Sequence, residues 1–457
     1  MKAHKRIRRW GGLLLVLGAT VAAAGCGGGD DSGGGASSGP LKVDKTPVTI
    51  TLRHPWTGDE KKIFEQTLEK FHTKYPWITV KTIGYPDSDT FDQQIVIKTI
   101  NAGDPPDAFL SFGPDYVGQY CSSGLWQDLT DYMKRDNVSI DDFAKAALTY
   151  TNFDGKQCAL PSLTDAFGLY YNKDMFAKAG ITSPPKTMTE LMDDAKKLTV
   201  RNPDGSIKVA GFVPLQDWGQ QGISDLARMW GAQWFDDSGK PSFASDPNWA
   251  AAMEWQKQLV DWYGYDNIAT FFQTYNGNEF SAQNALETGK VAMMFDGEWR
   301  TAFIKREHPE LKYGTAFVPA ADSNPDLYGA ARVGGTIVGI PKGSPHPDQA
   351  WLLVKFLSND PAYLVPMANA VGNVPTTAAS AGSPELALPP QFRTFIDVWN
   401  NSASSFSPPL TPSGAGYAKL LSDFDNKWVA GKVSDLPGGL ATLDSDVENQ
   451  LQLGEAP

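Results

Sequence analysis

The sequence is poor in the residues that bind metals: it has three cysteines and five histidines in 457 residues. Cys121 and Cys158 lack CxxC partners and the histidines are scattered, so we expect no metal site. HExxH and phosphate-loop motifs are missing, and the one GxSxG match, at residues 35–39, lies in a glycine-serine tract where a nucleophile elbow has no meaning. We therefore expect neither a cofactor nor enzymatic activity.

Positive charge is also in short supply. The formal net charge is −12, and loss of residues 1–25, with their five lysines and arginines, would make it −17. Such a balance disfavours nucleic acid as a partner and provides no basic patch for anionic lipid. An acidic net charge otherwise mostly favours solubility, and we expect no nucleic acid among the partners.

Residues 1–25 have the parts of a secretory signal: a basic start, an apolar run at 13–17, and small residues before Cys26. This apolar stretch is shorter than the roughly 20 residues of a spanning helix. Cys26 resembles the acylated cysteine of bacterial lipoproteins, although Ala23 stands where leucine is usual. We predict a signal peptide at 1–25 and a lipidated, flexible tether at 26–45, with ordinary secretion and an incidental cysteine as the alternative.

Strand and helix patterns alternate in the first part of the remaining chain. Buried strands are predicted at 48–52 and 108–112, and helices at 59–75 and 91–102. Alternation of this kind indicates an α/β layer fold with a largely parallel sheet. Further along, Thr187-Met188-Thr189-Glu190 is a capping box, which predicts a helix start. A strand at 291–295 and a helix opening at Pro347 follow.

Several ordered segments resemble one family, the extracellular solute-binding proteins of carbohydrate ABC importers, of the maltodextrin- and multiple-sugar-binding type. The strongest is GLYYNKDMF at 168–176, followed by AG at 179–180 and PPKT at 184–187. FHTKYPWITV at 71–80 and GDPPDAF at 103–109 match the family's amino-terminal elements. The resemblance covers nearly all of the chain after the tether.

The family implies a two-lobe α/β fold of the periplasmic-binding-protein type (type II), with a ligand cleft between lobes joined by crossing hinge segments. Residues 46–162 and 334–390 would form the amino-terminal lobe, and residues 166–330 and 400–457 the carboxyl-terminal lobe. The ligand would be a sugar, from mono- to oligosaccharide, and lobe closure around it would precede delivery to the ABC transporter permease subunits. The expected protein is a monomer, anchored by its lipid to the outer face of the cytoplasmic membrane.

A sugar site needs aromatic platforms and fixed polar groups, because sugars present both C–H faces and hydroxyls. Asp165 is the leading candidate, since the family's interlobe segment carries a sugar-binding acid there; a turn aspartate is the alternative. Trp299 matches the family's cleft tryptophan and would stack on the sugar; packing in the core is the alternative. Glu298, beside it, is a weaker ligand-binding candidate. Asp115 follows a predicted strand, where a helix N-cap would explain it as well.

Other candidates depend on position alone. Trp56 lies in the loop after the first strand and could instead pack on its own lobe. Arg332 precedes Gly335, near a lobe crossing, and could bind hydroxyls or pair with an aspartate. The glycine would allow close backbone approach. Trp218 and Tyr417 complete the ligand-binding candidates. We assign five other tryptophans to helix packing: Trp230, Trp255, Trp262, Trp351 and Trp428.

Cys121 and Cys158 are an even pair in an oxidising compartment, and the family places both in one lobe, so we predict a disulfide over two free thiols. For function, two alternatives stay open. The same fold could bind a polyol, a glycerol phosphodiester or a peptide, because fold does not fix cargo. An extracellular glycan-acting enzyme is the other, because acids also serve glycosidases.

Overall fold

The structure, a computed structural model, describes residues 44–85, 89–143, 145–215, 218, 221–400 and 405–455. The predicted signal peptide, Cys26 and most of the predicted tether lie outside these residues. In the described part, none of the helices is both long and apolar enough to cross a membrane.

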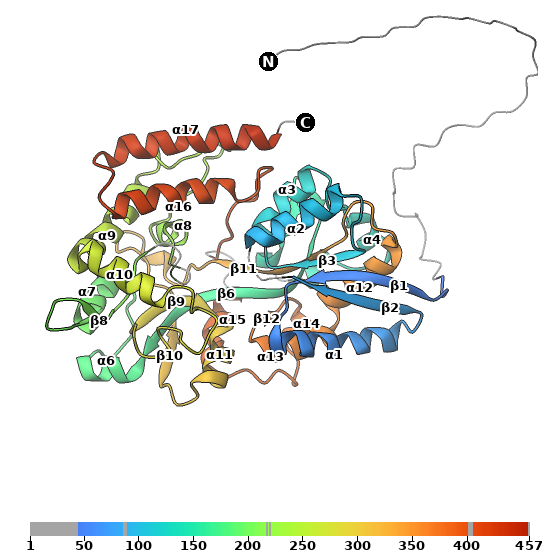
Figure 1. The fold of residues 1–457 in the computed structure, drawn as a ribbon, viewed down its shortest axis with the longest axis horizontal. Helices are drawn as coiled ribbons and strands as arrows, with labels where there is room; N and C mark the ends of the chain where they lie inside the picture. The colour runs from blue at the N-terminus through green and yellow to red at the C-terminus, as the bar shows by residue number, and fades with distance from the viewer. Residues whose placement is uncertain are drawn as a thin grey trace, which may run out of the picture. The chain divides into compact units, whose positions relative to one another are not determined.

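An eight-stranded sheet forms the centre of the described chain (Figure 1). β1 pairs in parallel with β2 and β3, whereas every strand paired with β6 runs antiparallel to it. The expectation of a largely parallel sheet is therefore correct for the first three strands and wrong for the rest. The sheet contains β1 (Val48–His54), β2 (Ile78–Gly84), β3 (Ala108–Ser111), β6 (Leu160–Asn172), β9 (Met293–Gly297), β10 (Tyr313–Ala316), β11 (Val333–Gly339) and β12 (Val374–Pro375).

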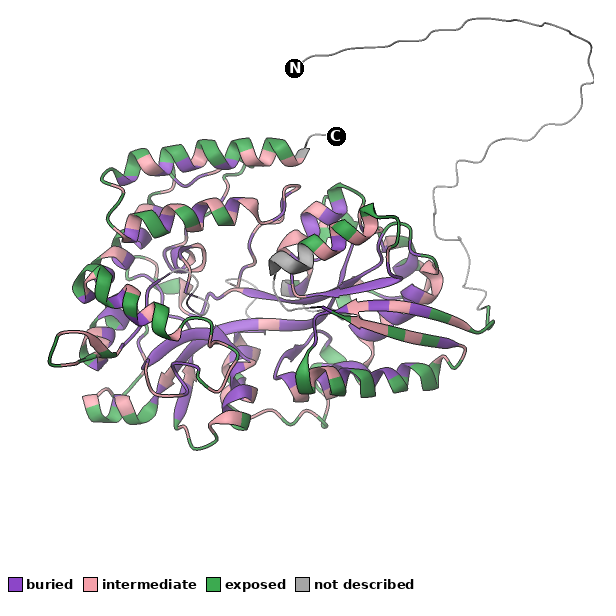
Figure 2. Ribbon diagram, in the orientation of Figure 1, coloured by how far each residue is buried: buried purple, intermediate pink, exposed green. Residues whose placement is uncertain are grey.

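The long strand β6 has two sets of partners. Its first half pairs with β11 and β12, and its second half pairs with β9 and β10. All of its residues are buried except Asp165 and Tyr171, and Figure 2 shows the neighbouring strands β11 and β9 equally buried. A strand covered on both faces needs an apolar sequence. The partly exposed Asp165 in its middle is therefore an exception that calls for a functional reason.

The predicted helices are present with small shifts in their ends. α1 (Gly58–Lys74) buries Phe64, Leu68 and Phe71, and it lies on the opposite side of the sheet from α3 (Figure 1). The Thr187 hydroxyl accepts the Glu190 N–H at the start of α7 (Met188–Leu198). Further helices are α2 (Asp89–Asn101), α3 (Val117–Ser122), α6 (Lys173–Ala179), α9 (Pro247–Tyr263), α10 (Tyr265–Tyr275), α11 (Arg300–Glu307), α12 (Pro347–Asn359), α13 (Pro361–Val371), α15 (Arg393–Asn400), α16 (Gly416–Val429) and α17 (Leu436–Glu455).

One tryptophan assigned to helix packing is exposed on the surface of its helix. Trp262, near the end of α9, is 39% exposed, and the Arg201 guanidinium lies 5.3 Å from the centroid of its ring. Trp255, Leu259 and Trp262 recur at intervals of four and three positions, as expected along one face of a helix, and all three lie in α9. The assignment of Trp262 to packing was wrong, because its ring lies on the exposed side of the helix with the Arg201 guanidinium over it.

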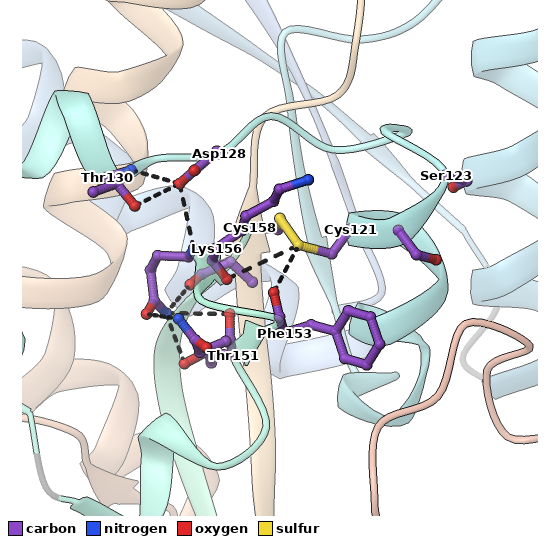
Figure 3. The surroundings of a disulfide bond; sticks show 12 residues. Cys121, Ser123, Asp128, Thr130, Thr151, Phe153, Lys156 and Cys158 are labelled. Carbon is purple, nitrogen blue, oxygen red and sulfur yellow. Dashed lines mark hydrogen bonds between the residues drawn. A yellow bond between two sulfur atoms is a disulfide. The ribbon is translucent and has the colours of Figure 1, made fainter. Parts of the chain in front are cut away.

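A disulfide joins Cys121, in the last turn of α3, to Cys158, two residues before β6 (Figure 3). The two Cα atoms are 5.6 Å apart, and both side chains are buried. The carbonyl oxygens of Phe153 and Lys156 lie 3.7 and 3.9 Å from Cys121 Sγ. These are contacts without a donated hydrogen, because a disulfide sulfur carries none. The bond fixes α3 to the start of the central strand.

We expect loss of this bond to destabilise the protein measurably. The cysteines are separated by 37 positions, and closing a loop of that size restricts the unfolded chain by about 2–4 kcal/mol. The double variant C121S/C158S should therefore lose about that much free energy of unfolding in urea titrations. Dithiothreitol should lower the midpoint of the unmodified protein and leave that of the double variant unchanged. Equal sensitivity of both to the reductant would contradict the assignment.

Candidate functional site

The site is built around Asp165, in the middle of β6. Its neighbour across the sheet is Gly334 of β11, and the strand changes partners immediately afterwards. Asn373 Nδ2 donates to Asp165 Oδ1 over 2.6 Å. Asn373 directly follows Gly372, whose left-handed conformation (φ 75°) ends α13, and precedes β12. Two elements far apart in sequence therefore meet at this carboxylate.

Glu298 lies on the other side of the same asparagine. It follows β9, and its side chain is fully buried. Asn373 Nδ2 donates to Glu298 Oε1 (2.8 Å), and the Ala166 N–H donates to Glu298 Oε2 (2.7 Å). Burial, and then the charge of Asp165, raise the pKa of Glu298 well above its usual value. Glu298, predicted as a ligand-binding residue beside Trp299, is thus a buried group that is hydrogen-bonded to Asn373, the partner of Asp165.

Trp299 is partly exposed and directly precedes α11 as its N-cap residue. Its ring meets Phe167 edge-on, with centroids 5.3 Å apart, and Phe280 lies 6.5 Å away on another side. A Cβ at Gly297 would lie 2.1 Å from the Trp299 ring, so that glycine leaves the ring its place. Phe280 itself is 57% exposed. An aromatic surface with an open neighbour is available for a ligand's apolar face.

The structure joins Arg332 and Asp115 in an ion pair. Arg332 Nη2 donates to Asp115 Oδ2 (3.1 Å), and Arg332 Nη1 lies 3.6 Å from Asp225 Oδ2 of α8 (Ile223–Leu226). The guanidinium carbon is also 5.9 Å from the centroid of the Phe167 ring, on which Trp299 packs. Burial raises the pKa of Asp225, and the Arg332 charge opposes that rise. Arg332 is thus paired with aspartates, one of the two roles weighed for it, and its contact with a ligand stays a prediction.

The remaining candidates lie deeper. Trp56 is 4% exposed and meets Phe112 edge-on at 4.8 Å. The hydroxyl of the buried Tyr417 donates to the Pro409 carbonyl, and burial, with the Asp115 charge next, raises its pKa well above its usual value. Trp218 packs on the Phe272 ring and lines a small cavity that Tyr275, Glu279 and Met294 also line. All three rings are buried by neighbouring side chains, and their contact with a ligand stays a prediction.

Gly335 brings two strands unusually close. Its φ is 138°, and a Cβ there would lie 2.3 Å from the Leu163 carbonyl oxygen and 2.8 Å from Thr164 Cα. Both contacts are with the backbone of β6, directly before Asp165. Gly335 thus allows the close backbone approach that was expected of it, and the backbone that it approaches is that of β6, which carries Asp165.

A cavity of about 280 Å³ lies elsewhere, between the segment around Phe143, β12 and α15. None of the nine predicted ligand-binding residues lines it. Within the part of the chain that is described, no group of three or more histidines, cysteines and acids is arranged to hold a metal ion. At the Asp165 site the structure provides acid and amide groups for hydrogen bonding, together with the Trp299 ring.

Sequence reasoning missed Asn373 and Phe280. Asn373 had a weak local signal, a helix-ending glycine followed by a polar residue and then Val374-Pro375. Phe280 had none, because a single phenylalanine in a loop is more often covered than open. Asn373 joins the site through contacts with Asp165 and Glu298, 208 and 75 positions away, and Phe280 through its contact with Trp299. Local sequence patterns do not contain such contacts.

Comparisons with known proteins agree on one family. Residues 55–363 match the family model described as bacterial extracellular solute-binding protein. The maltotriose-binding protein of Pyrococcus abyssi is 22% identical over 341 residues, 74% of this chain and 68% of the relative. The maltooligosaccharide ABC transporter solute-binding lipoprotein of Streptococcus pneumoniae serotype 4 is 27% identical over 297 residues, 61% of each chain.

A solved structure extends the likeness to nearly the whole described chain. The mannotriose-bound structure of CpMnBP1 superimposes with a TM-score of 0.77 at 27% identity, covering 87% of this chain and 99% of that one. The predicted two-lobe α/β fold is thereby confirmed. The boundaries predicted for the two lobes stay predictions.

Proposed function

Because this chain belongs to the bacterial extracellular solute-binding protein family, we propose that it captures a sugar outside the cytoplasmic membrane and delivers it to the permease of an ABC importer. The relatives named for maltotriose and maltooligosaccharides, and the mannotriose-bound neighbour, support a sugar as its ligand. The ligand lies at the Asp165 site and is enclosed by closure of the two lobes. The protein acts as a monomer.

The observation that carries this proposal is the pairing of an open aromatic surface with a fixed carboxylate. Trp299 and the exposed Phe280 offer faces to C–H groups, and Asp165 accepts from hydroxyls. Asn373 holds the carboxylate in place before the ligand arrives, which reduces the ordering cost of binding. Such a site suits an uncharged, hydroxyl-rich molecule.

A phosphorylated or acidic solute fits this site less well. The one cation among the predicted ligand-binding residues, Arg332, is already engaged by Asp115 and Asp225. An anionic ligand would have to compete with both aspartates for it. A neutral polyol stays compatible with the same groups, and it is the second ligand class that the experiment below includes.

Hydrolysis of a glycan has less support. A glycosidase needs two carboxyls facing one glycosidic bond from either side. Here Glu298 is fully buried, and both of its oxygens accept hydrogen bonds from within the protein. It supports Asp165 and has no open path to a substrate bond.

The predicted lipid on Cys26 would place the protein at the outer face of the cytoplasmic membrane, whether in a periplasm or at a cell surface. The relative named as a lipoprotein supports this anchoring. Incorporation of radiolabelled palmitate in cells, lost in C26A, is the expected result if the thiol is acylated; secretion of unmodified protein would contradict it.

The proposed function predicts ligand-dependent stabilisation. A ligand at 100 times its dissociation constant adds about 2.7 kcal/mol to the free energy of unfolding, so melting curves with mannotriose, maltotriose, maltose or mannitol should shift upward for the correct class. Asp165→Ala and Trp299→Ala should each weaken that ligand about tenfold or more, because they remove a charge-assisted hydrogen bond or a stacking face. Lobe closure should reduce the radius of gyration in small-angle scattering of the same samples.

The matched controls are Asp237→Ala and Trp262→Ala, which remove an exposed acid and an exposed tryptophan away from the site. They should bind as the unmodified protein does. If the controls and the site variants lose affinity alike, the site assignment is wrong. Shifts with phosphorylated or peptide solutes alone would overturn the sugar proposal, and an unchanged radius of gyration would overturn closure.

A further inference from the structure

One amide nitrogen serves two carboxyl groups at the centre of the site. Asn373 Nδ2 donates to Asp165 Oδ1 over 2.6 Å and to Glu298 Oε1 over 2.8 Å. An NH₂ group has two hydrogens, so these contacts use its whole donor capacity. The two acids are thereby held within reach of a single atom, one partly exposed and the other fully buried.

Backbone contacts hold Glu298 and Asn373 in place beside Asp165. The carboxyl of Glu298 accepts the Ala166 N–H, and the Glu298 N–H donates to the Ala166 carbonyl, so Glu298 is tied twice to the residue after Asp165. Asn373 is set by Gly372, which ends α13, and by β12, where Val374 pairs with Thr164. The set therefore joins β6, the β9–α11 connection and the α13–β12 connection.

The groups around Glu298 disfavour a second negative charge. From β6 it faces Asp165 and the buried hydroxyl of Tyr170, which donates to the Gly297 carbonyl. From the segment after α5 (Lys145–Leu148) it faces the buried Tyr150, whose hydroxyl lies 3.3 Å from Thr164 Oγ1. From β9 comes Asp296, whose charge is balanced by Arg300. Two ionised carboxyls so close to one amide would repel each other with little water to screen them.

We propose that Asn373 and Glu298 are positioning residues for Asp165, and that Glu298 fills this role in its protonated, uncharged form. The proposal rests on the proposed function, since it assumes that Asp165 contacts the ligand. With Glu298 neutral, the full negative charge belongs to Asp165, where a ligand hydroxyl can donate to it. Loss of the Glu298 proton puts a second charge behind Asp165 just where a bound ligand excludes water.

This arrangement makes ligand affinity depend on pH. Burial and the Asp165 charge raise the pKa of Glu298, so the proton is held in the folded protein above the ordinary range of a glutamate. Binding favours the protonated form, and affinity should fall by up to tenfold per pH unit once pH exceeds the pKa of Glu298 in the free protein. In that range binding should also take up a proton.

Infrared spectroscopy tests the protonation state without any ligand. The unmodified protein should show a protonated-carboxyl band at pH 7 that is absent from Glu298→Gln. In Asp165→Asn the same band should disappear at a lower pH, because the charge that repels the ionised form of Glu298 is gone. If the Glu298-dependent band is absent at pH 7, or if its midpoint is the same in Asp165→Asn, the proposal is overturned.

Mannotriose binding, measured by calorimetry between pH 5 and 9, tests the consequence. Affinity should fall with pH in the unmodified protein and stay flat in Glu298→Gln, in which the side chain is uncharged at every pH. Asn373→Ala should weaken binding about tenfold or more, whereas Asn369→Ala, which removes a hydrogen-bonded carboxamide one turn earlier on α13, should not.

The failures of the two proposals are distinguishable. Mannotriose binding with no pH dependence would overturn the positioning role and leave the sugar-binding function standing. Absence of binding by mannotriose and by every other member of the sugar panel would count against the proposed function, while the infrared result would still decide whether Glu298 holds its proton beside Asp165.

Discussion

Replacing Arg300 with alanine is expected to lower the free energy of unfolding by about 3–5 kcal/mol. Arg300 Nε donates to Asp296 Oδ2 (2.6 Å) and Nη1 donates to Glu287 Oε1 (2.9 Å), and all three side chains are fully buried. Removing the cation leaves two acids in the interior without a counter-charge. Urea unfolding followed by tryptophan fluorescence would measure the loss.

This cluster also supports the functional site. Asp296 and Arg300 flank the short segment that carries Glu298 and Trp299, so their ion pair closes the turn on which both stand. Arg300→Ala should accordingly weaken ligand binding as well as the fold. The effect on binding comes through Trp299, whose ring depends on the position of that turn.

The pH dependence of Arg300→Ala has a definite sign. Burial already raises the pKa of Asp296 and of Glu287, and the Arg300 charge opposes the rise. Without Arg300 the folded protein should hold their protons to still higher pH. A raised folded-state pKa in an acid means stability that falls as pH increases, so the variant should lose more at pH 8 than at pH 5.

The matched control is Arg393→Ala, which breaks an exposed ion pair with Asp397 four residues away on α15. Exposed pairs at this spacing contribute about 0.5 kcal/mol or less. A loss below 1 kcal/mol in Arg300→Ala, or a loss equal to that of Arg393→Ala, would show that the buried cluster is not structurally needed.

Gly335→Ala is the second change with a large expected effect, about 3 kcal/mol or more. A φ of 138° is unfavourable for any residue with a side chain, which alone costs about 1–3 kcal/mol. The new Cβ would also lie 2.3 Å from the Leu163 carbonyl oxygen, so β11 would have to move away from β6. Thermal unfolding and ligand affinity should both suffer, because Asp165 follows that contact by two residues.

Two other glycines separate the causes. Gly334 directly precedes Gly335, and a Cβ there would come no closer than 3.9 Å to Pro114 Cγ. Gly334→Ala should therefore hardly change the free energy of unfolding. Gly103 has a φ of 73° but open space around the added atom, so Gly103→Ala should show the backbone cost alone, about 1 kcal/mol. Similar losses in Gly334→Ala and Gly335→Ala would contradict the close-approach argument.

Much of the fold could be predicted because its determinants are local. Phe64, Leu68 and Phe71 recur at intervals of four and three positions, which is the spacing of one helix face, so a helix at 59–75 could be predicted. The capping box at Thr187 likewise predicted the start of α7. The direction of the later strands could not be predicted in this way. β6 pairs with segments between residues 293 and 375, and no periodicity within a strand states which distant segment will lie beside it.

The candidate site divides along the same line. The family resemblance proposed Asp165 and Trp299, and the structure gives both of them partial exposure. It could not show that Trp56 and Tyr417 would be covered, because burial of an aromatic ring depends on what folds over it. It also could not pair Arg332 with Asp115 or place Asn373 between two acids, since each contact joins separate parts of the chain.

The two sets of partners of β6 have a consequence for how the protein is made. Residues 173–292 must follow β6 before β9 exists, and β12 is complete only at Pro375. Until β9 has been made, β6 has both edges unpaired, which is the state most exposed to aggregation. Completion of the sheet around β6 should therefore be slow, because its strand pairs join segments far apart in the chain.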